Sequence, residues 1–218
     1  SDQWGNITAG IDLIRRTAGG AAHGLTWPLL LKSDGTKFGK TAGGSVWLDP
    51  EKTSPYQFRQ FWIQSDDSMV GEYLLRFSSR PLDEVQALIA DHAAAPERRA
   101  AQRALARELT ALVHGDDAAA AADEAAEVLF GGDPTQASAA ALTAVAREVG
   151  SSQISEAQLD DLVAVLVGAG LATSNSDARR NLGSGTYRAN GVVLDANAQL
   201  TGIARLHGAE QVAATSSL

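Results

Sequence analysis

A glycine-punctuated loop holds the residue types that best fit phosphate chemistry. Lys37 and Lys40 flank Gly39, and the hydroxyl of Thr41 follows directly. Two ammonium groups this close can neutralise charge on neighbouring phosphates, and glycine lets the backbone approach a ligand. The spacing differs from the GxxxxGK[ST] pattern of the P-loop. Residues 34–41 therefore predict either a loop that stabilises charge on a leaving phosphate or an ordinary solvated loop with two lysines.

The first residues of the chain combine acid and amide side chains around an aromatic ring. Asp2 and Gln3 precede Trp4, just before a helical pattern at residues 7–16. A carboxylate and an amide can hydrogen-bond sugar hydroxyls, as acidic residues do at nucleotide ribose sites. A turn with a helix cap explains the same residues. Both interpretations stay open from the residues alone.

Two groups of arginines could contact RNA. The first shares a predicted helix face and comprises Arg99, Arg103 and Arg107. The second surrounds a predicted hairpin and comprises Arg179, Arg180 and Arg188. Arginines grouped in this way can bind nucleic-acid phosphates. For the first group, a solvated helix face that pairs with Glu97 and Glu108 is the alternative.

The elements that position these residues begin with a glycine-rich first segment, residues 1–52. A helix over residues 7–16 should stop at Gly19 and Gly20. Residues 25–31 form an apolar run of buried-strand length, although Pro28 prevents a regular central strand. Helix, buried strand and glycine loop in series indicate the end of an α/β domain.

The second segment, residues 53–150, is predicted to be helical. Ser54 followed by Pro55 is a helix start signal. Further helices are expected at residues 81–92, 96–115, 118–130 and 137–149. The apolar side chains expected to face inward are Phe58, Phe61, Trp62, Leu82, Val85, Leu88, Ile89, Leu105, Leu109, Leu112 and Val113.

The third segment, residues 153–208, is predicted to be a small α+β module. Ser155 with Gln158 and Ser174 with Asp177 are capping boxes, each expected to open a helix. The dipeptide at 190–191, Asn-Gly, is a strong signal for a two-residue hairpin turn. Residues 209–218 form an atypical tail.

Composition excludes several classes of protein. The chain has 218 residues and no cysteine, which excludes a disulfide-built secreted scaffold and a thiolate metal site. No apolar run approaches the ~20 residues that cross a bilayer, so we predict no membrane partner. The four histidines lack ligand spacing, so we predict no protein-bound metal. The net charge of −8 is concentrated in residues 116–161, which hold ten acids and one base. This local excess of acids does not exclude RNA as a partner of the rest of the chain.

Six stretches, in this order, closely resemble the bacterial tyrosyl-tRNA synthetases, which are class I aminoacyl-tRNA synthetases. They are SDQWGNITAG at 1–10, GLTWPLL at 24–30, DGTKFGKT at 34–41, WLDPEKTSPYQFRQFW at 47–62, RAAQRALARELTALVHG at 99–115 and LVGAGLATSNSDARRNL at 166–182. KFGKT looks like this family's version of the class I Lys-Met-Ser-Lys-Ser loop. The similarity extends over nearly the whole chain up to about His207.

The resemblance implies an enzyme that joins tyrosine to ATP, releases pyrophosphate and passes the tyrosyl group to tRNA-Tyr. It implies that the catalytic residues are Lys37, Lys40 and Thr41, on a mobile loop that stabilises the ATP phosphates. It implies that ATP and the adenylate are bound by Asp2, Gln3, Lys37, Gly39 and Lys40. Asp2 and Gln3 match family positions at the adenylate ribose and the tyrosyl end. ATP would act with Mg²⁺, as a substrate.

The resemblance also implies a fold and a setting. Residues 1–52 would be the α/β remnant of a Rossmann-like catalytic domain. Residues 53–150 would be an all-α domain at the anticodon region, followed by the small α+β RNA-binding module. Weak RNA contacts would come from Arg99, Arg103, Arg179, Arg180 and Arg188. The family is cytoplasmic and dimeric, so a homodimer is expected in the intact parent, while the oligomeric state of this chain stays open.

Departures from the family pattern qualify these expectations. The first half of the catalytic domain, with its His-Ile-Gly-His type motif, is absent from the sequence. The chain also begins with Ser1 and has Met69 as its only methionine, so we expect a C-terminal part of a longer protein or a trimmed piece. We therefore predict that this chain alone does not form tyrosyl-adenylate. Residues 209–218 lack lysine and arginine, and Asn175 stands where a lysine is common, which predicts weak RNA binding.

Two alternatives to the enzyme origin stay open. One is a non-catalytic tRNA- or RNA-binding protein that uses only the helical and C-terminal modules. The other is a non-functional truncated product. Retention of the full lysine loop, which has no purpose in a pure RNA binder, favours the enzyme.

Overall fold

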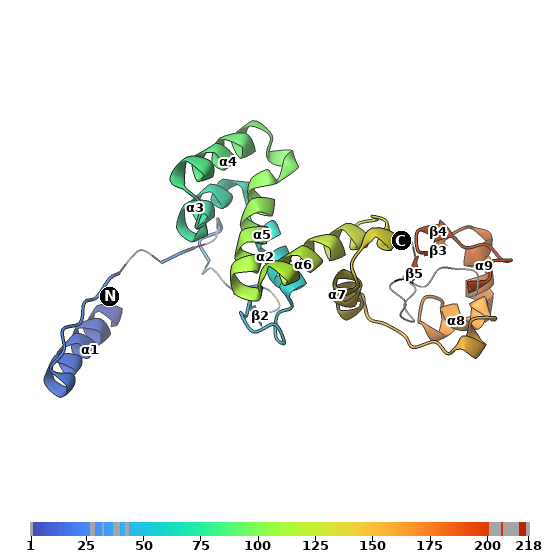
Figure 1. The fold of residues 1–218 in the computed structure, drawn as a ribbon, viewed down its shortest axis with the longest axis horizontal. Coiled ribbons are helices and arrows are strands. Elements are labelled where there is room, and N and C mark those ends of the chain that lie inside the picture. The colour runs from blue at the N-terminus through green and yellow to red at the C-terminus, as the bar shows by residue number, and fades with distance from the viewer. Residues whose placement is uncertain are drawn as a thin grey trace. The chain divides into compact units, whose positions relative to one another are not determined.

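The chain divides into two compact units, residues 1–43 and 44–218. The computed structural model describes residues 2–26, 29–31, 33–36, 40–41, 44–200, 206 and 214–216. Figure 1 follows the chain through its helices to the short strands near the C-terminus. Among the described residues, no helix combines the length and the apolar character that a membrane span requires.

The first unit contains one long helix, α1 (Asp2–Ala18), and the short strand β1 (Lys40–Thr41). The helix ends as predicted, because Gly19 follows it with a φ of 62°, a left-handed conformation that favours glycine. It begins earlier than predicted, however. Gln3 and Trp4, which were expected just before the helix, lie in its first turn.

The predicted buried strand at residues 25–31 is wrong for the residues that the structure describes. Leu25 is 82% exposed and Leu29 is 67% exposed, while Leu31 makes a single-residue bridge. An apolar run is stable as a buried strand only where other elements cover its faces and pair with its edges. The described part of this unit contains one long helix, which cannot cover both faces and both edges of such a strand.

The second unit begins with a bundle of helices. After strand β2 (Gly44–Ser45) the helices are α2 (Pro55–Ile63), α3 (Asp67–Phe77), α4 (Leu82–Ala94), α5 (Ala100–His114), α6 (Asp116–Leu129) and α7 (Ala139–Val149). Single 3-10 turns, η1 (Pro96–Arg98) and η2 (Pro134–Gln136), precede α5 and α7. Helix α2 starts as predicted, since the Ser54 hydroxyl accepts the Gln57 N–H in a full capping box.

The core of the helical part is aromatic and aliphatic. Phe58 and Trp62 from α2 are buried against Tyr73 from α3, and the Trp62 and Tyr73 rings meet edge to face with centroids 6.2 Å apart. Leu105 and Leu109 from α5 are also buried, as predicted. Aromatic pairs in this arrangement contribute stability beyond the area that they bury.

Two side chains that were expected to face inward are exposed. Leu82 is 61% exposed because it is the first residue of α4, one turn ahead of the buried Val85. Leu112 is 68% exposed. The buried positions on α5 recur every four residues, and an α-helix turns by more than one full rotation over that interval. The buried face therefore drifts around α5 and leaves Leu112 at its edge.

The last part of the second unit is the small α+β module. It comprises the 3-10 turn η3 (Glu156–Gln158), helices α8 (Leu162–Gly168) and α9 (Asn175–Gly183), and strands β3 (Tyr187–Ala189), β4 (Val192–Val193) and β5 (Ala214–Ser216). The strand order is β4-β3-β5, and both pairs are antiparallel. The hairpin prediction is confirmed, because Asn190 and Gly191 have φ values of 48° and 80°, as a type I′ turn requires.

The helix starts in this module follow the predicted caps in part. Ser174 accepts the Asp177 N–H at 3.2 Å and opens α9, as predicted. The contact between Ser155 and Gln158 also forms, but it closes the 3-10 turn η3, and Asp161 caps α8 instead. Strand β5 lies in the segment that was treated as an atypical tail, and it pairs with β3.

Candidate functional site

We call residues 34–41 the lysine loop. Its first described residues form a turn. The Asp34 carboxylate accepts the Thr36 backbone N–H at 2.9 Å and the Thr36 hydroxyl at 2.6 Å. Gly35 lies between them with a φ of 76°. Lys37 and Gly39 lie outside the described residues, and of Lys40 and Thr41 only the backbone, in β1, is described. The role of these four residues at ATP phosphates stays a prediction.

The chain that continues from this loop is tightly folded. We call residues 46–54 the connector. The Asp49 carbonyl accepts the N–H groups of Lys52 and Thr53 at 3.0 and 3.1 Å. The Thr53 hydroxyl accepts the Trp47 N–H at 3.0 Å, and the Lys52 ammonium lies 4.5 Å from the Trp47 ring centroid. These contacts hold the connector in one compact turn before α2 begins.

The candidate residues for ribose and tyrosyl contacts lie at the start of α1. Gln3 is exposed in the first turn, and Asp2 is described by its backbone alone. Trp4 beside them is 60% exposed. An exposed amide such as that of Gln3 is chemically suited to sugar hydroxyls. Their grouping with Lys37 and Lys40 into one ATP site stays a prediction.

The prediction that Arg99, Arg103 and Arg107 share one helix face is wrong for Arg99. This residue precedes α5 with a left-handed backbone, φ 50° and ψ 35°, instead of lying in the helix. Its guanidinium donates to the carbonyls of Ile63 and Ser65 in the turn between α2 and α3. The 3-10 turn η1 interrupts the helix that Pro96 was expected to open, and this interruption redirects Arg99 into the protein.

The other two arginines of that group differ from each other. Arg107 pairs with Asp123 at 2.6 Å, and the same carboxylate binds the largely buried Arg59 at 2.5 Å. Arg103 is exposed and donates to the Arg98 carbonyl. The alternative pairing with Glu108 is also wrong, because Glu108 accepts from Ser78, Ser79 and Arg80. Within this group, Arg107 is thus held by an ion pair, whereas Arg103 is held by a backbone carbonyl.

The arginines of the C-terminal module are exposed. Arg179 and Arg180 lie on α9, and Arg188 lies on β3, where it donates to the Gly191 carbonyl at 3.2 Å. Arg180 pairs with Asp177 at 2.5 Å, with its own side chain 76% exposed. The pKa of Asp177 is lowered, first by the Thr173 N–H and hydroxyl and to a lesser degree by Arg180. Such an exposed ion pair is weak and leaves Arg180 able to exchange partners.

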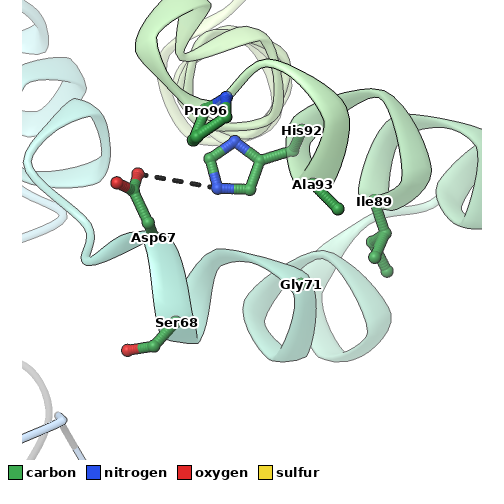
Figure 2. A pocket seen from close by; sticks show the side chains of 7 residues that line it. All are labelled: Asp67, Ser68, Gly71, Ile89, His92, Ala93 and Pro96. Carbon is green, nitrogen blue, oxygen red and sulfur yellow. Dashed lines mark ion pairs between the residues drawn. The ribbon is translucent and has the colours of Figure 1, made fainter.

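A pocket that the sequence did not indicate lies between α3 and α4 (Figure 2). It has a volume of about 420 Å³ and is lined by Asp67, Ser68, Gly71, Ile89, His92, Ala93 and Pro96. The His92 Nε2 lies 3.5 Å from the Asp67 carboxylate, and Figure 2 shows the imidazole between Asp67 and Pro96. Gln102, which is fully buried, donates to the same carboxylate at 2.7 Å.

This pocket combines an apolar wall with one acid and one imidazole. No spacing in the sequence connects Asp67, His92 and Gln102, which come from three helices. Their convergence explains why the histidine is buried and satisfied on one side by a carboxylate. Among the described residues, no group of histidine, aspartate and glutamate side chains could hold a metal ion.

Comparisons with known proteins place these elements in a family. The model of the family "tRNA synthetases class I (W and Y)" matches residues 1–131. The tyrosine--tRNA ligase of Roseiflexus castenholzii is 50% identical over 92% of this chain and 49% of its own length. The tyrosine--tRNA ligase of Geobacillus kaustophilus is 50% identical over 95% of this chain and 50% of its own length. The chain thus spans about half the length of the curated relatives it matches.

Among solved structures, a C-terminally truncated mitochondrial tyrosyl-tRNA synthetase of Coccidioides posadasii is 33% identical. The match covers 56% of this chain and 36% of the chain in that structure, with a TM-score of 0.46. The family model carries the assignment, because it extends from the α1 helix through the lysine loop and the helices α2 to α6. The chain therefore belongs to the class I tRNA synthetases of the tryptophan and tyrosine group.

Proposed function

We propose that this chain is the C-terminal half of a tyrosine--tRNA ligase. Such an enzyme activates tyrosine with ATP and transfers the tyrosyl group to tRNA-Tyr. The observation that carries this proposal is the 50% identity to tyrosine--tRNA ligases along 92–95% of the chain. The family itself includes enzymes for tryptophan and for tyrosine, and the two named relatives favour tyrosine.

In this proposal the first 43 residues contribute to ATP chemistry. Lys37 and Lys40 neutralise the charge that grows on the leaving pyrophosphate, and Thr41 donates a hydrogen bond to it. Gly39 allows the backbone to approach the phosphates. Asp2 and Gln3 bind the ribose and the tyrosyl end of the adenylate. Magnesium enters with ATP as part of the substrate.

The rest of the chain contributes to tRNA binding. The helices α2 to α7 contact the anticodon region, and the small α+β module adds Arg179, Arg180 and Arg188 as exposed cations. Arg103 supplies a further exposed cation on α5. We also propose that the intact protein is cytoplasmic and forms a homodimer. A purely RNA-binding role is not favoured, because the two relatives that match 92–95% of this chain are tyrosine--tRNA ligases.

The test compares two amino acids in the full-length protein that contains this chain. We expect ATP–pyrophosphate exchange that depends on tyrosine, and charging of tRNA-Tyr. Exchange with tryptophan in place of tyrosine would assign the chain to the other branch of the family. The 218-residue chain alone should show no exchange above background, and tyrosine-dependent exchange by it would contradict the proposed division of the site.

A further inference from the structure

Asp67 places a carboxylate in the pocket between α3 and α4 (Figure 2). Within the described part of the chain, its only ion-pair partner is the His92 imidazole, whose Nε2 lies 3.5 Å from the Asp67 Oδ1. The described residues that line the pocket include neither lysine nor arginine. The Asp67 side chain is 57% exposed, so a bound group can reach it from solvent. The charge of the pocket therefore favours a cationic ligand.

This carboxylate is held in place from inside the protein. Gln102, which is fully buried on α5, donates its amide to the Asp67 Oδ1 at 2.7 Å. A hydrogen bond from a buried side chain keeps its acceptor in one orientation, and a group that is oriented before binding loses less entropy when a ligand arrives. Asp67 is therefore a preorganised acceptor, unlike a surface carboxylate that is free to rotate.

The imidazole beside it has hydrogen-bonding capacity that the described residues leave unused. His92 is 7% exposed, and its Nδ1 is buried without a hydrogen-bond partner among the described residues. Figure 2 shows the ring between Asp67 and Pro96, and proline has no N–H that could donate to it. The Nε2 is 3.5 Å from the carboxylate, which is longer than an ordinary hydrogen bond. A buried polar group without a partner is costly, so a ligand that bonds to the ring offsets part of this cost.

The two facing atoms suit a single ammonium group. Because the Asp67 Oδ1 and the His92 Nε2 are 3.5 Å apart, one nitrogen can lie about 2.9 Å from both. An ammonium group has three N–H donors, and the Nε2 accepts one of them when the ring proton is on Nδ1. Hydrogen bonds from a cation to a carboxylate are stronger than neutral ones. The pair therefore forms a two-point acceptor for a primary amine in its charged form.

Gly71 keeps space open beside this acceptor pair. It lies inside α3 with an ordinary helical backbone, and the nearest atoms to a Cβ built there belong to Ile89, at 3.5–3.7 Å. These are ordinary van der Waals distances, so alanine would fit, and alanine favours a helix more than glycine does. Neither the backbone nor the packing therefore explains the glycine. The absent methyl group instead leaves room in the pocket, next to an apolar wall that Ala93 and Pro96 complete.

We propose that this pocket binds a small primary amine whose ammonium group bridges Asp67 and His92 and whose apolar body lies against Gly71. The chemical class is an alkyl- or arylalkylammonium ion. The volume of about 420 Å³ lies within the range of small-molecule pockets. A ligand that contacts both α3 and α4 stabilises the folded helical part. None of the residues that hold the amine is among those assigned to ATP or to RNA, so the site is independent of the proposed catalytic function.

Binding is tested on the 218-residue chain with benzylammonium chloride as the probe. At pH 7.5, an NMR titration should give saturable shifts of backbone amides in α3 and α4, including those of Ser68, Gly71 and Ala93. Benzyl alcohol has the same size without the charge, and it should bind at least about tenfold more weakly. Equal binding of the two probes, or the absence of saturable shifts, would overturn the proposal.

A further probe distinguishes a free amine from a lysine side chain of a protein partner. Nα-acetyl-lysine methylamide carries the same ammonium group on a peptide-like body. It should bind more weakly than benzylammonium, since the apolar wall favours an apolar body. Tighter binding of the lysine probe would assign the pocket to a protein partner and reject the small amine as its ligand.

Two variants separate the site from general effects on folding. Asp67→Asn should weaken benzylammonium binding about tenfold or more because it removes the charge, whereas Asp91→Asn, at an exposed position of α4, should change it less than about twofold. Gly71→Ala should weaken binding about tenfold because its methyl group occupies ligand space, while the melting temperature stays unchanged or rises. Gly10→Ala, in α1, is the matched glycine control. Unchanged affinity in either pocket variant would refute the site.

Discussion

The two units of this chain bury their apolar side chains very differently. In the first unit, the described residues between 3 and 36 include no buried side chain, and Leu13 and Leu25 are 60% and 82% exposed. In the second unit, Leu74 and Leu105 are fully buried among six helices. The residues predicted to do chemistry thus lie in the unit whose described side chains are all at least partly exposed. The free energy of unfolding of this chain should come mainly from the helices.

The largest expected effect tests this contrast directly. Leu74→Ala should lower the free energy of unfolding by about 2–5 kcal/mol, because it removes a fully buried side chain and leaves a cavity. The matched variant Leu13→Ala, on the exposed side of α1, should change it by less than about 0.5 kcal/mol. Urea unfolding of the 218-residue chain, followed by circular dichroism, measures both. Equal losses would show that the first unit contributes to the same cooperative core.

The second prediction reverses the contrast, because activity should depend on the unit that contributes little stability. Lys40→Ala in the full-length protein should lower the rate of tyrosine activation by about 100-fold or more, as loss of a charge-stabilising group does. The melting temperature should stay unchanged. Single-turnover pyrophosphate release measures the rate, and Arg98→Ala serves as the control for loss of an exposed cation. An unchanged rate would reject the assignment of the loop.

A smaller effect extends the comparison to the C-terminal module. Ser174→Ala should lower the free energy of unfolding by about 1 kcal/mol, because the hydroxyl caps α9 by accepting the Asp177 N–H. Ser151→Ala, an exposed serine outside any helix, is the control. Thermal unfolding of the two variants should separate them by a few degrees. Identical curves would indicate that the module unfolds separately from the transition that is observed.

The smallest expected effect concerns the free energy of unfolding at acid pH. Burial lowers the pKa of His114, whose ring meets Phe58 edge to face at 5.1 Å. The unfolded chain therefore binds more protons than the folded chain just below about pH 6.5, so stability falls as the pH drops through that window. His114→Gln should reduce this fall relative to the unmodified chain. Urea unfolding at pH 7.5 and pH 5.5 compares them.

Local signals in the sequence predicted local structure well. The cap at Ser54, the stop at Gly19 and the turn at Asn190 and Gly191 all appear where they were expected. Each depends on residues within one turn of each other, whose preferences act before any tertiary contact forms. The helix α3 was not predicted, although Val70, Tyr73, Leu74 and Phe77 lie at helical spacing and Asp66 precedes them. That element could have been found by the same reasoning.

Features that depend on partners far along the chain could not be predicted in this way. Arg99 looked like one member of an exposed row, and it bonds to carbonyls between α2 and α3. Asp67, His92 and Gln102 converge from three helices without any shared spacing. Leu25 and Leu29 looked like a buried strand and are exposed in the described structure. In each case the outcome depends on which element packs nearby.

The sequence by itself determined the starts of α2 and α9, the hairpin and the family, because these depend on short-range preferences and on matched stretches of residues. Only the tertiary structure decided that Arg147 and Glu148 reach the connector and that Asp123 joins Arg59 to Arg107. A hydrogen bond forms only when two groups come within about 3 Å. Distances between segments separated by many residues follow from the packing of the whole bundle.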